Sequence, residues 1–285
     1  MRNVVILLVC IVAAASCAGG GQAGERQVIT VTIDPLRCFT EAIAGDRFDV
    51  VSMVPAGTSP ETYDPAPQQL LALSKSAAYF MAGYLGFEVN WCGRLKDNCP
   101  GVPFFDTSEG ISLIVSQEEG HEGHRHAGGV EPHVWNSTAN AARIADNICR
   151  ALCRIDGGHA EEYVSRADSL KRVISLTDSE IRSLLSGRGK SFLIYHPALS
   201  YFARDYGLHQ ISIEEEGKEP SPSALQRLIR QCREQGVEVI FVQQEFDVRN
   251  AQLIADELGV EVIPINPLSY EWREEMIGVA RALAK

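Results

Sequence analysis

The stretch from His159 to Leu185 contains neither glycine nor proline, and its apolar residues recur with the period of an α-helix. A helix over this stretch makes roughly seven turns. Shorter strand and helix patterns alternate on both sides of it. We therefore expect an α/β fold with two βαβ-type lobes, each built on a central sheet, joined by one long rigid helix over 159–186. The N-terminal lobe then covers residues 27–158, and the C-terminal lobe covers residues 187–285.

Runs of β-branched and apolar residues mark the expected strands of both lobes. In the first lobe they lie at 27–34, 48–55 and 77–84. In the second lobe they lie at 192–195, 209–213, 237–246 and 260–267. Helical segments separate them, including one from about Asn136 to Arg154. Strands that alternate with helices in this way are typical of open sheets with a ligand crevice.

The N-terminus has the features of an export signal. "MRNVVILLVCIVAAASC" begins with one arginine, continues with an apolar run from Val4 to Val12 and ends in small residues. The last four residues resemble a bacterial lipobox, so we expect a lipoprotein signal peptide over 1–17 with Cys17 lipidated; the alternative is an ordinary cleaved signal. Residues 18–26 would form a flexible tether. Because no other segment approaches about 18 apolar residues, we expect a lipid-anchored protein of the periplasm or cell surface.

Charge and cysteine content narrow the partners and the compartment. The formal net charge is −11, and no basic run is present, which argues against nucleic acid as a partner. Six cysteines follow the signal peptide, which fits an oxidising compartment. Cys92 and Cys99 bracket the polar segment "CGRLKDNC" and are the favoured candidates for a disulfide. Cys149 and Cys153 have a spacing that places them on one face of a helix.

Polar residues that directly follow strands are the candidates for a binding site, because ligands bind at the carboxyl ends of parallel strands. Four of them stand out, with Glu245 as a fifth: Glu61, His133, His196 and Asn266. His196 follows the apolar run "FLIY" and precedes a proline, and the alternative for it is a satisfied buried histidine. His133 stands beside a proline and close to an aromatic residue.

Three further histidines precede His133 in a glycine- and glutamate-rich segment, the loop 118–130. They are His121, His124 and His126. The segment has no periodicity, so we expect a mobile loop that collects or senses metal and is not a preformed site. The alternative is a solvated insertion without function.

Six motifs in order resemble one known family, and they extend over nearly all of the mature chain. They are "GTSPETYDPAP", "HEGHRHAGGVEPHVW", the long helix, "YHPALSYFARDYGL", "KEPSPSAL" and "INPLS". Together they resemble the periplasmic zinc/manganese solute-binding proteins of ABC importers, the ZnuA/TroA-like family. Two positions depart from the family pattern: Glu61 stands where the family has its first ligand histidine, and Asn266 stands where it often has aspartate.

The resemblance implies a metal site in the cleft between the lobes. Its ligands would be Glu61, His133 and His196, with the fourth position open to Asn266, a water molecule or Glu245. Two imidazoles and a carboxylate suit Zn²⁺ with a fourth ligand, and they also suit Mn²⁺ or Fe²⁺. Zinc, carried as cargo, is favoured because the chain keeps His196 and the histidine-rich loop.

The family resemblance also implies the function: high-affinity capture of the metal by a monomeric receptor, and delivery to an ABC permease and its ATPase in the inner membrane. A manganese or iron receptor and a surface adhesin that retains the fold are the alternatives. A zinc hydrolase would share the ligand types. No HExxH motif is present, however, and no second carboxylate is spaced to act as a general base, so we expect no enzyme.

Overall fold

The computed structural model describes residues 26–115, 129–187, 191–214, 218 and 220–285. The signal peptide, Cys17 and nearly all of the tether lie outside the described residues, as do His121, His124 and His126. The predictions for them therefore stay predictions. No helix in the described ranges is both long enough and apolar enough to cross a membrane.

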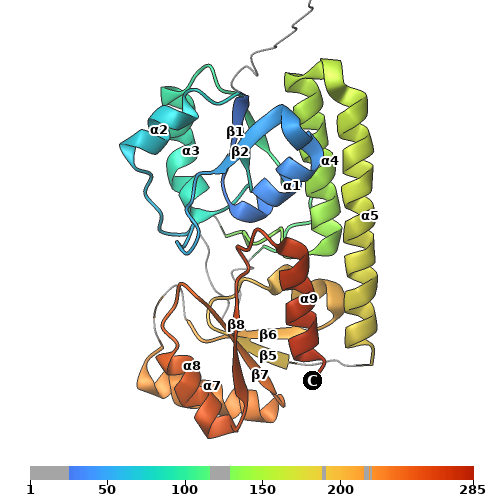
Figure 1. The fold of residues 1–285 in the computed structure, drawn as a ribbon. Coiled ribbons are helices and arrows are strands. Elements are labelled where there is room, and N and C mark those ends of the chain that lie inside the picture. The colour runs from blue at the N-terminus through green and yellow to red at the C-terminus, as the bar shows by residue number, and fades with distance from the viewer. Residues whose placement is uncertain (1–25, 116–128, 188–190, 215–217, 219) are drawn as a thin grey trace, which may run out of the picture.

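The first lobe is a four-stranded parallel sheet with the strand order β2-β1-β3-β4. Its strands are β1 (Gln27–Val31), β2 (Phe48–Ser52), β3 (Ala78–Met81) and β4 (Phe104–Asp106). Its helices are α1 (Asp34–Ala44), α2 (Pro67–Leu73), α3 (Gly86–Asn98) and α4 (Thr138–Ile155), with a short 3₁₀ turn at Gly45–Arg47. Figure 1 shows this lobe above the second one.

The second lobe repeats the arrangement with the strand order β6-β5-β7-β8, again all parallel. Its strands are β5 (Ser191–Ile194), β6 (His209–Ser212), β7 (Val239–Gln243) and β8 (Glu261–Ile265). Its helices are α6 (Ser200–Tyr206), α7 (Pro222–Glu234), α8 (Arg249–Leu258) and α9 (Trp272–Leu283). The predicted fold of two α/β lobes is confirmed.

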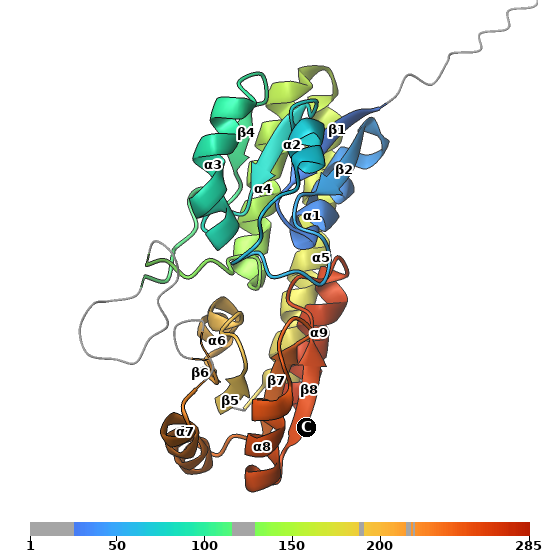
Figure 2. The same cartoon turned by 90° about the vertical axis from the view of Figure 1, so that its left-hand side faces the viewer.

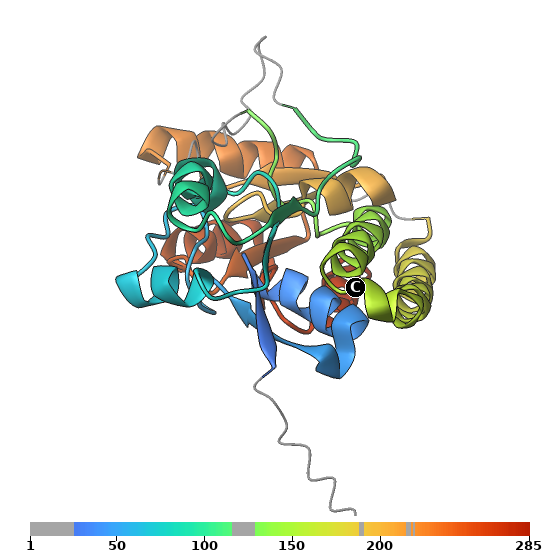
Figure 3. The same cartoon turned by 90° about the horizontal axis from the view of Figure 1, so that it is seen from above.

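The long helix α5 (Ala160–Leu185) runs along both lobes, as the views in Figures 1 and 2 show. A 3₁₀ turn at Gly157–His159 connects it to α4, and the two helices lie side by side (Figure 3). One continuous apolar core includes α1, α4, α5 and α9 together with β5 and β7. The lobes are therefore joined by packing as well as by the connecting helix.

Local sequence signals explain where several helices begin and end. The side chain of Ser137 caps α4 by accepting the N–H of Asn140, and Ser221 caps α7 in the same way. Pro222 at the start of α7 needs no hydrogen-bond partner for its nitrogen. Gly207 ends α6 in the left-handed conformation (φ 64°), which few other residues adopt easily.

The strand order places a topological switch point in each lobe. In the first sheet, β1 and β3 lie side by side, and the chain leaves them in opposite directions, toward β2 and toward β4. In the second sheet, β5 and β7 lie side by side, and the chain leaves them toward β6 and toward β8. Crevices that bind ligands form at such points. His196 follows β5, and Glu245 follows β7, so two of the candidate residues lie at the switch point of the second lobe.

The predicted disulfide between Cys92 and Cys99 is wrong. Both are free thiols, as are the other four described cysteines. The segment read as a polar loop is the second half of α3, with Cys99 at its C-cap. Cysteines seven positions apart on a helix are separated by about 10 Å along its axis, beyond the separation of about 7 Å that a disulfide can bridge. Cys149 and Cys153 do lie on one helix, α4.

The switch point of the first lobe holds a buried carboxyl group, that of Glu88. Its Oε1 accepts the N–H of Ala82 at 2.6 Å, and its Oε2 accepts the N–H of Gly83 at 2.6 Å. The hydroxyl of Thr32 donates to Oε1 at 2.5 Å. The carboxyl group thus joins the ends of β1 and β3. Burial is the main cause that raises its pKa to about 7.

This carboxyl group predicts a pH-dependent stability. The pKa of Glu88 is higher in the folded than in the unfolded protein, so its contribution is fully present below about pH 4.5 and lost as the pH rises through 7. Relative to Glu88→Gln, the free energy of unfolding of the metal-free wild type should fall by up to about 3 kcal/mol between pH 5 and pH 8. Urea unfolding at several pH values measures this change. Glu234→Gln, at an exposed position of α7, is the control. If the free energies of unfolding of Glu88→Gln and wild type changed with pH in the same way, Glu88 would not be the cause of the pH dependence.

Candidate metal centre

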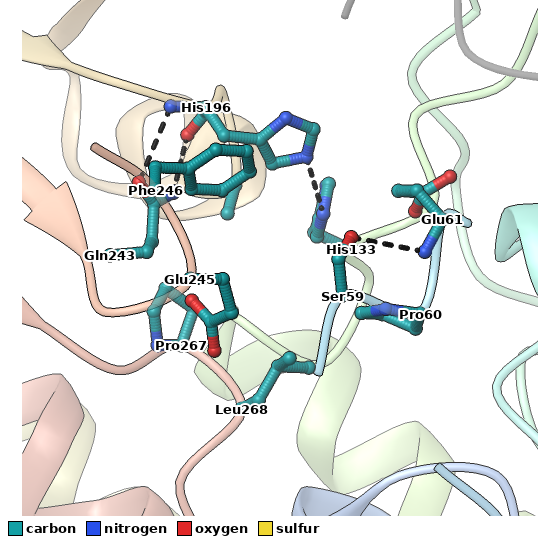
Figure 4. Close-up of a pocket in the computed structure, with 11 residues that line it drawn as sticks. Ser59, Pro60, Glu61, His133, His196, Gln243, Glu245, Phe246, Pro267 and Leu268 are labelled. Carbon is teal, nitrogen blue, oxygen red and sulfur yellow. Dashed lines mark hydrogen bonds between the residues drawn. The ribbon is translucent and has the colours of Figure 1, made fainter. Parts of the chain in front are cut away.

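A small cavity lies between the two lobes, where the loops after the strands meet (Figure 4). Its lining comes from both lobes: Ser59, Pro60, Glu61, His133, His196, Ala198, Gln243, Glu245, Phe246, Pro267 and Leu268. Its volume is about 30 Å³. Pockets for organic ligands measure roughly 300–1,000 Å³, so this space fits an ion and its coordinating atoms.

His133 belongs to the first lobe and is held by the preceding acidic residue. It is 4% exposed, and its Nδ1 lies 2.5 Å from Oε1 of Glu131, which also accepts the backbone N–H of His133 at 3.1 Å. Burial lowers the pKa of His133 below its ordinary value. Burial therefore favours the uncharged ring, and in the tautomer that donates Nδ1–H to Glu131 the Nε2 lone pair faces the cavity.

His196 is held in the same way by the second lobe. Its Nδ1 lies 2.7 Å from Oε1 of Glu214, a residue that is 5% exposed. The side-chain amide of Gln243 fixes its backbone: Nε2 donates to the His196 carbonyl at 2.6 Å, and Oε1 accepts the His196 N–H at 3.3 Å. Phe246 stacks on the ring at an interplanar angle of 17°. The imidazole therefore has a fixed orientation toward the first lobe.

The two imidazoles meet at Nε2, 3.2 Å apart, as the dashed line in Figure 4 marks. The Nδ1 atom of each ring faces a carboxylate. A ring that donates its Nδ1–H to that carboxylate offers its Nε2 lone pair to a cation. Two nitrogen ligands of a tetrahedral metal ion, each at about 2.0–2.1 Å, would be about 3.3 Å apart. The observed separation, which is also that of a hydrogen bond between the two rings, is close to that of two ligands on one metal ion.

Two carboxylates line the same cavity, one from each lobe. Glu61 follows β2, and its Oε2 accepts the N–H of Gly86 at 3.1 Å. Glu245 follows β7 at the switch point of the second sheet. The Oε1 atoms of both are buried without a hydrogen-bond partner. An unpartnered buried carboxylate oxygen is unfavourable, and a bound cation would remove that cost.

Asn266, the other candidate for the fourth ligand, is used differently. Its side-chain oxygen accepts the N–H of Leu268 at 3.1 Å, and its backbone N–H donates to Glu275 at 2.8 Å. It does not line the cavity, whereas the next two residues, Pro267 and Leu268, do. The amide of Asn266 thus shapes the turn after β8.

The structure brings four of the candidate residues to one cavity: Glu61, His133, His196 and Glu245. Within the described ranges, however, no three histidine, cysteine, aspartate or glutamate side chains are grouped closely enough to hold a metal as they stand. The imidazole pair is in place, and the carboxylates lie further away.

Sequence reasoning missed the two carboxylates that orient the imidazoles. Glu131 stands two positions before His133 in "EPHVW", and this spacing could have suggested the contact. Glu214 is 18 residues from His196 and reaches it only because β5 and β6 are neighbours in the sheet.

Comparison with known proteins gives a consistent picture. The zinc-binding lipoprotein AdcA of Streptococcus pneumoniae is 27% identical over 282 residues, covering 94% of this chain and 56% of AdcA, so the chain spans about half the length of that relative. The manganese ABC transporter substrate-binding lipoprotein PsaA of Streptococcus mitis is 24% identical over 279 residues, covering 92% of this chain and 87% of PsaA.

A crystal structure of ZnuA is similar in fold as well as in sequence. It superposes with a TM-score of 0.84 at 32% identity, over 91% of this chain and 98% of that one. The family described as "ZnuA: Zinc-uptake complex component A periplasmic" matches residues 29–282, which include both lobes and every residue of the cavity. The chain therefore belongs to the ZnuA family of metal-binding solute-binding proteins.

Proposed function

We propose that this chain is an extracytoplasmic receptor for one divalent transition-metal ion, foremost zinc, which it delivers to an ABC permease and its ATPase. The observation that carries the proposal is the pair of Nε2 atoms 3.2 Å apart, each on an imidazole whose Nδ1 faces a buried carboxylate. Such a pair is preorganised for a cation before any cation arrives. Membership of the ZnuA family supports it.

The proposed ligands are Glu61 and His133 from the first lobe and His196 and Glu245 from the second. Glu245 is preferred to Asn266 for the fourth position because its Oε1 is buried without a partner, whereas the Asn266 oxygen is already used by Leu268. Two neutral imidazoles and two carboxylates balance the charge of a divalent cation.

Metal capture then consists of a short approach of the carboxylates toward the imidazole pair. Because ligands come from both lobes, an occupied site favours the arrangement in which the lobes are closest. The shared apolar core and α5 keep this change small. A local movement at Glu61, with its Gly86 contact kept, and of the loop that carries Glu245 is sufficient.

Zinc is preferred to manganese or iron because the site keeps two imidazoles and has room for few ligands. Glu61, in the position of a family histidine, retunes the site: a carboxylate favours harder ions relative to an imidazole. Replacing Glu61 by histidine should therefore raise the preference for zinc over manganese.

The location of the protein is part of the same proposal. AdcA and PsaA are named as lipoproteins, which supports lipidation at Cys17 and an anchored position outside the cytoplasm. The chain acts as a monomer, and the loop with His121, His124 and His126 collects metal for the cleft. We assign no catalytic step to the protein. Glu61 and Glu245, the proposed carboxylate ligands, would both be bound to the metal, so neither could act as a general base.

Metal content and competition titration test the proposal. Purified mature protein should hold one zinc ion per chain by mass spectrometry and should prefer zinc in competition with manganese. Glu61→Ala and Glu245→Ala each remove a proposed ligand, so each should weaken binding by at least the roughly 10–100-fold that loss of an orienting group costs. Asn266→Ala, the matched control for the fourth position, should not.

The other outcomes are equally informative. Stoichiometric manganese or iron would keep the receptor and change its cargo. Loss of metal in Asn266→Ala alone would return the fourth position to Asn266. A protein that binds none of these metals tightly would overturn the receptor function and favour an adhesin that retains the fold.

A further inference from the structure

The loop that carries Glu61 rests on the first turn of α3. The backbone N–H of Gly86 donates to Oε2 of Glu61 at 3.1 Å, and the N–H of Phe87 donates to the carbonyl of Pro60 at 2.9 Å. First-turn N–H groups have no partner within their own helix, and here the loop supplies it. The ring of Tyr63, further along the loop, lies 5.8 Å from that of Phe87.

Gly86 also fits this contact because it has no side chain. A Cβ atom there would lie 2.6 Å from the Glu61 carbonyl oxygen and 2.7 Å from Oε2, closer than real contacts allow. Its backbone lies in helix α3 and outside the left-handed region, so Glu61 itself is what excludes a larger residue. Gly93 in the same helix is different, because a Cβ there would meet nothing within 4 Å.

The two oxygens of Glu61 are therefore unequal. Oε2 is occupied by the helix, whereas Oε1 is buried in the cavity wall without a hydrogen-bond partner. A carboxylate held in this way presents one oxygen to a cation. Oε2 keeps a second lone pair, but the hydrogen bond from Gly86 orients the carboxylate and makes Oε2 the weaker donor, so Oε1 is the preferred oxygen for a cation.

We propose that Gly86 is a specificity-determining residue, which keeps Glu61 a one-oxygen ligand and the bound ion four-coordinate. This inference rests on the proposed metal-binding function. One oxygen each from Glu61 and Glu245 and two imidazole nitrogens make four donors, the number zinc prefers. Manganese and ferrous iron favour more oxygen ligands. The contact with Gly86 thus limits how far the carboxylate at position 61 shifts the site toward those ions.

Gly86→Ala tests this directly. Its zinc affinity should fall by about 10–100-fold, the usual effect of losing a group that orients a ligand. The affinity for manganese should fall less, so the ratio of zinc affinity to manganese affinity should decrease. X-ray absorption at the zinc edge should show four donors in wild type and an altered shell in the variant. Gly93→Ala is the matched control and should reproduce the wild-type affinities.

A double-mutant cycle separates this role from a general effect on folding. In a Glu61→Ala background, Gly86→Ala should change zinc affinity little, because no carboxylate remains to be displaced. An undiminished effect in that background would overturn the inference, as would a Gly86→Ala protein with wild-type zinc affinity and ratio. A wild-type protein that binds no metal would instead overturn the proposed function itself.

Discussion

Replacing His196 by alanine is expected to remove stoichiometric zinc from the protein, lowering its zinc affinity by more than about a hundredfold. Groups that only orient a ligand are worth about 10–100-fold, and His196 is proposed as a ligand itself. The loss has two parts: one of two imidazoles disappears, and His133 loses the partner 3.2 Å away that shares the cation. Competition titration with a chromogenic zinc chelator measures the change.

Two further variants serve as a control and as an intermediate case for this experiment. His209→Ala removes an exposed histidine on β6 and should leave zinc affinity unchanged. Glu214→Ala leaves His196 in place but removes the acceptor of its Nδ1 proton. The zinc affinity of Glu214→Ala should lie between those of His209→Ala and His196→Ala, about 10–100-fold below that of wild type. Equal affinities for His196→Ala and wild type would show that the imidazole pair is not the metal site.

The sequence was sufficient to predict the two lobes, the long helix and two histidines, His133 and His196, that line the cavity. The prediction of α5 depends on a stretch without glycine or proline, and the helix found spans Ala160–Leu185. His196 was identifiable because it follows β5 and precedes a proline, where a parallel sheet leaves room for a ligand. His133 follows no strand directly in the structure, and its signal was the short motif "EPHVW". These features are local, so they can be read from short stretches of sequence.

The features that could not be predicted correctly from the sequence depend on contacts between distant segments. The Cys92–Cys99 segment is polar enough to suggest a loop, yet it folds as α3, whose apolar contacts include the buried Leu95. Asn266 and Glu245 could not be ranked, because the ranking depends on which of the two oxygens is already hydrogen-bonded. Glu88 and Gly86 carry no local signal at all, since their roles depend on how α3 meets the loops after β1, β2 and β3.

The largest effect on stability is expected from Trp135, two residues after His133. Its side chain is fully buried, and its indole N–H donates to the carbonyl of Pro267 at 2.7 Å, across the boundary between the lobes. In the other direction, the indole N–H of Trp272 donates to the Trp135 carbonyl at 2.8 Å. Trp272 in turn packs edge-on against Phe39 of α1. Two buried tryptophans therefore connect the lobes beside the metal cavity.

Trp135→Ala should lower the free energy of unfolding of the metal-free protein by about 4 kcal/mol, the usual effect of removing a large buried aromatic side chain. Trp135→Phe keeps most of the apolar contact but leaves the Pro267 carbonyl without its donor. This variant should therefore lower the free energy of unfolding by about 1–3 kcal/mol. Urea unfolding measures both. Trp91→Ala, at a partly buried position of α3, should have a smaller effect, because its indole hydrogen bond to Asp64 is exposed.

The same pair of contacts limits how far the two lobes can separate. A wide separation of the lobes would break both indole hydrogen bonds and expose two buried rings, which is far less favourable than a local movement at Glu61 and Glu245. Trp135→Phe should therefore weaken zinc binding while the protein stays folded, because Pro267 lines the cavity. Wild-type zinc affinity in this variant would show that the lobes are held at the cavity by other contacts, and the small-motion mechanism would then rest on α5 and the shared core alone.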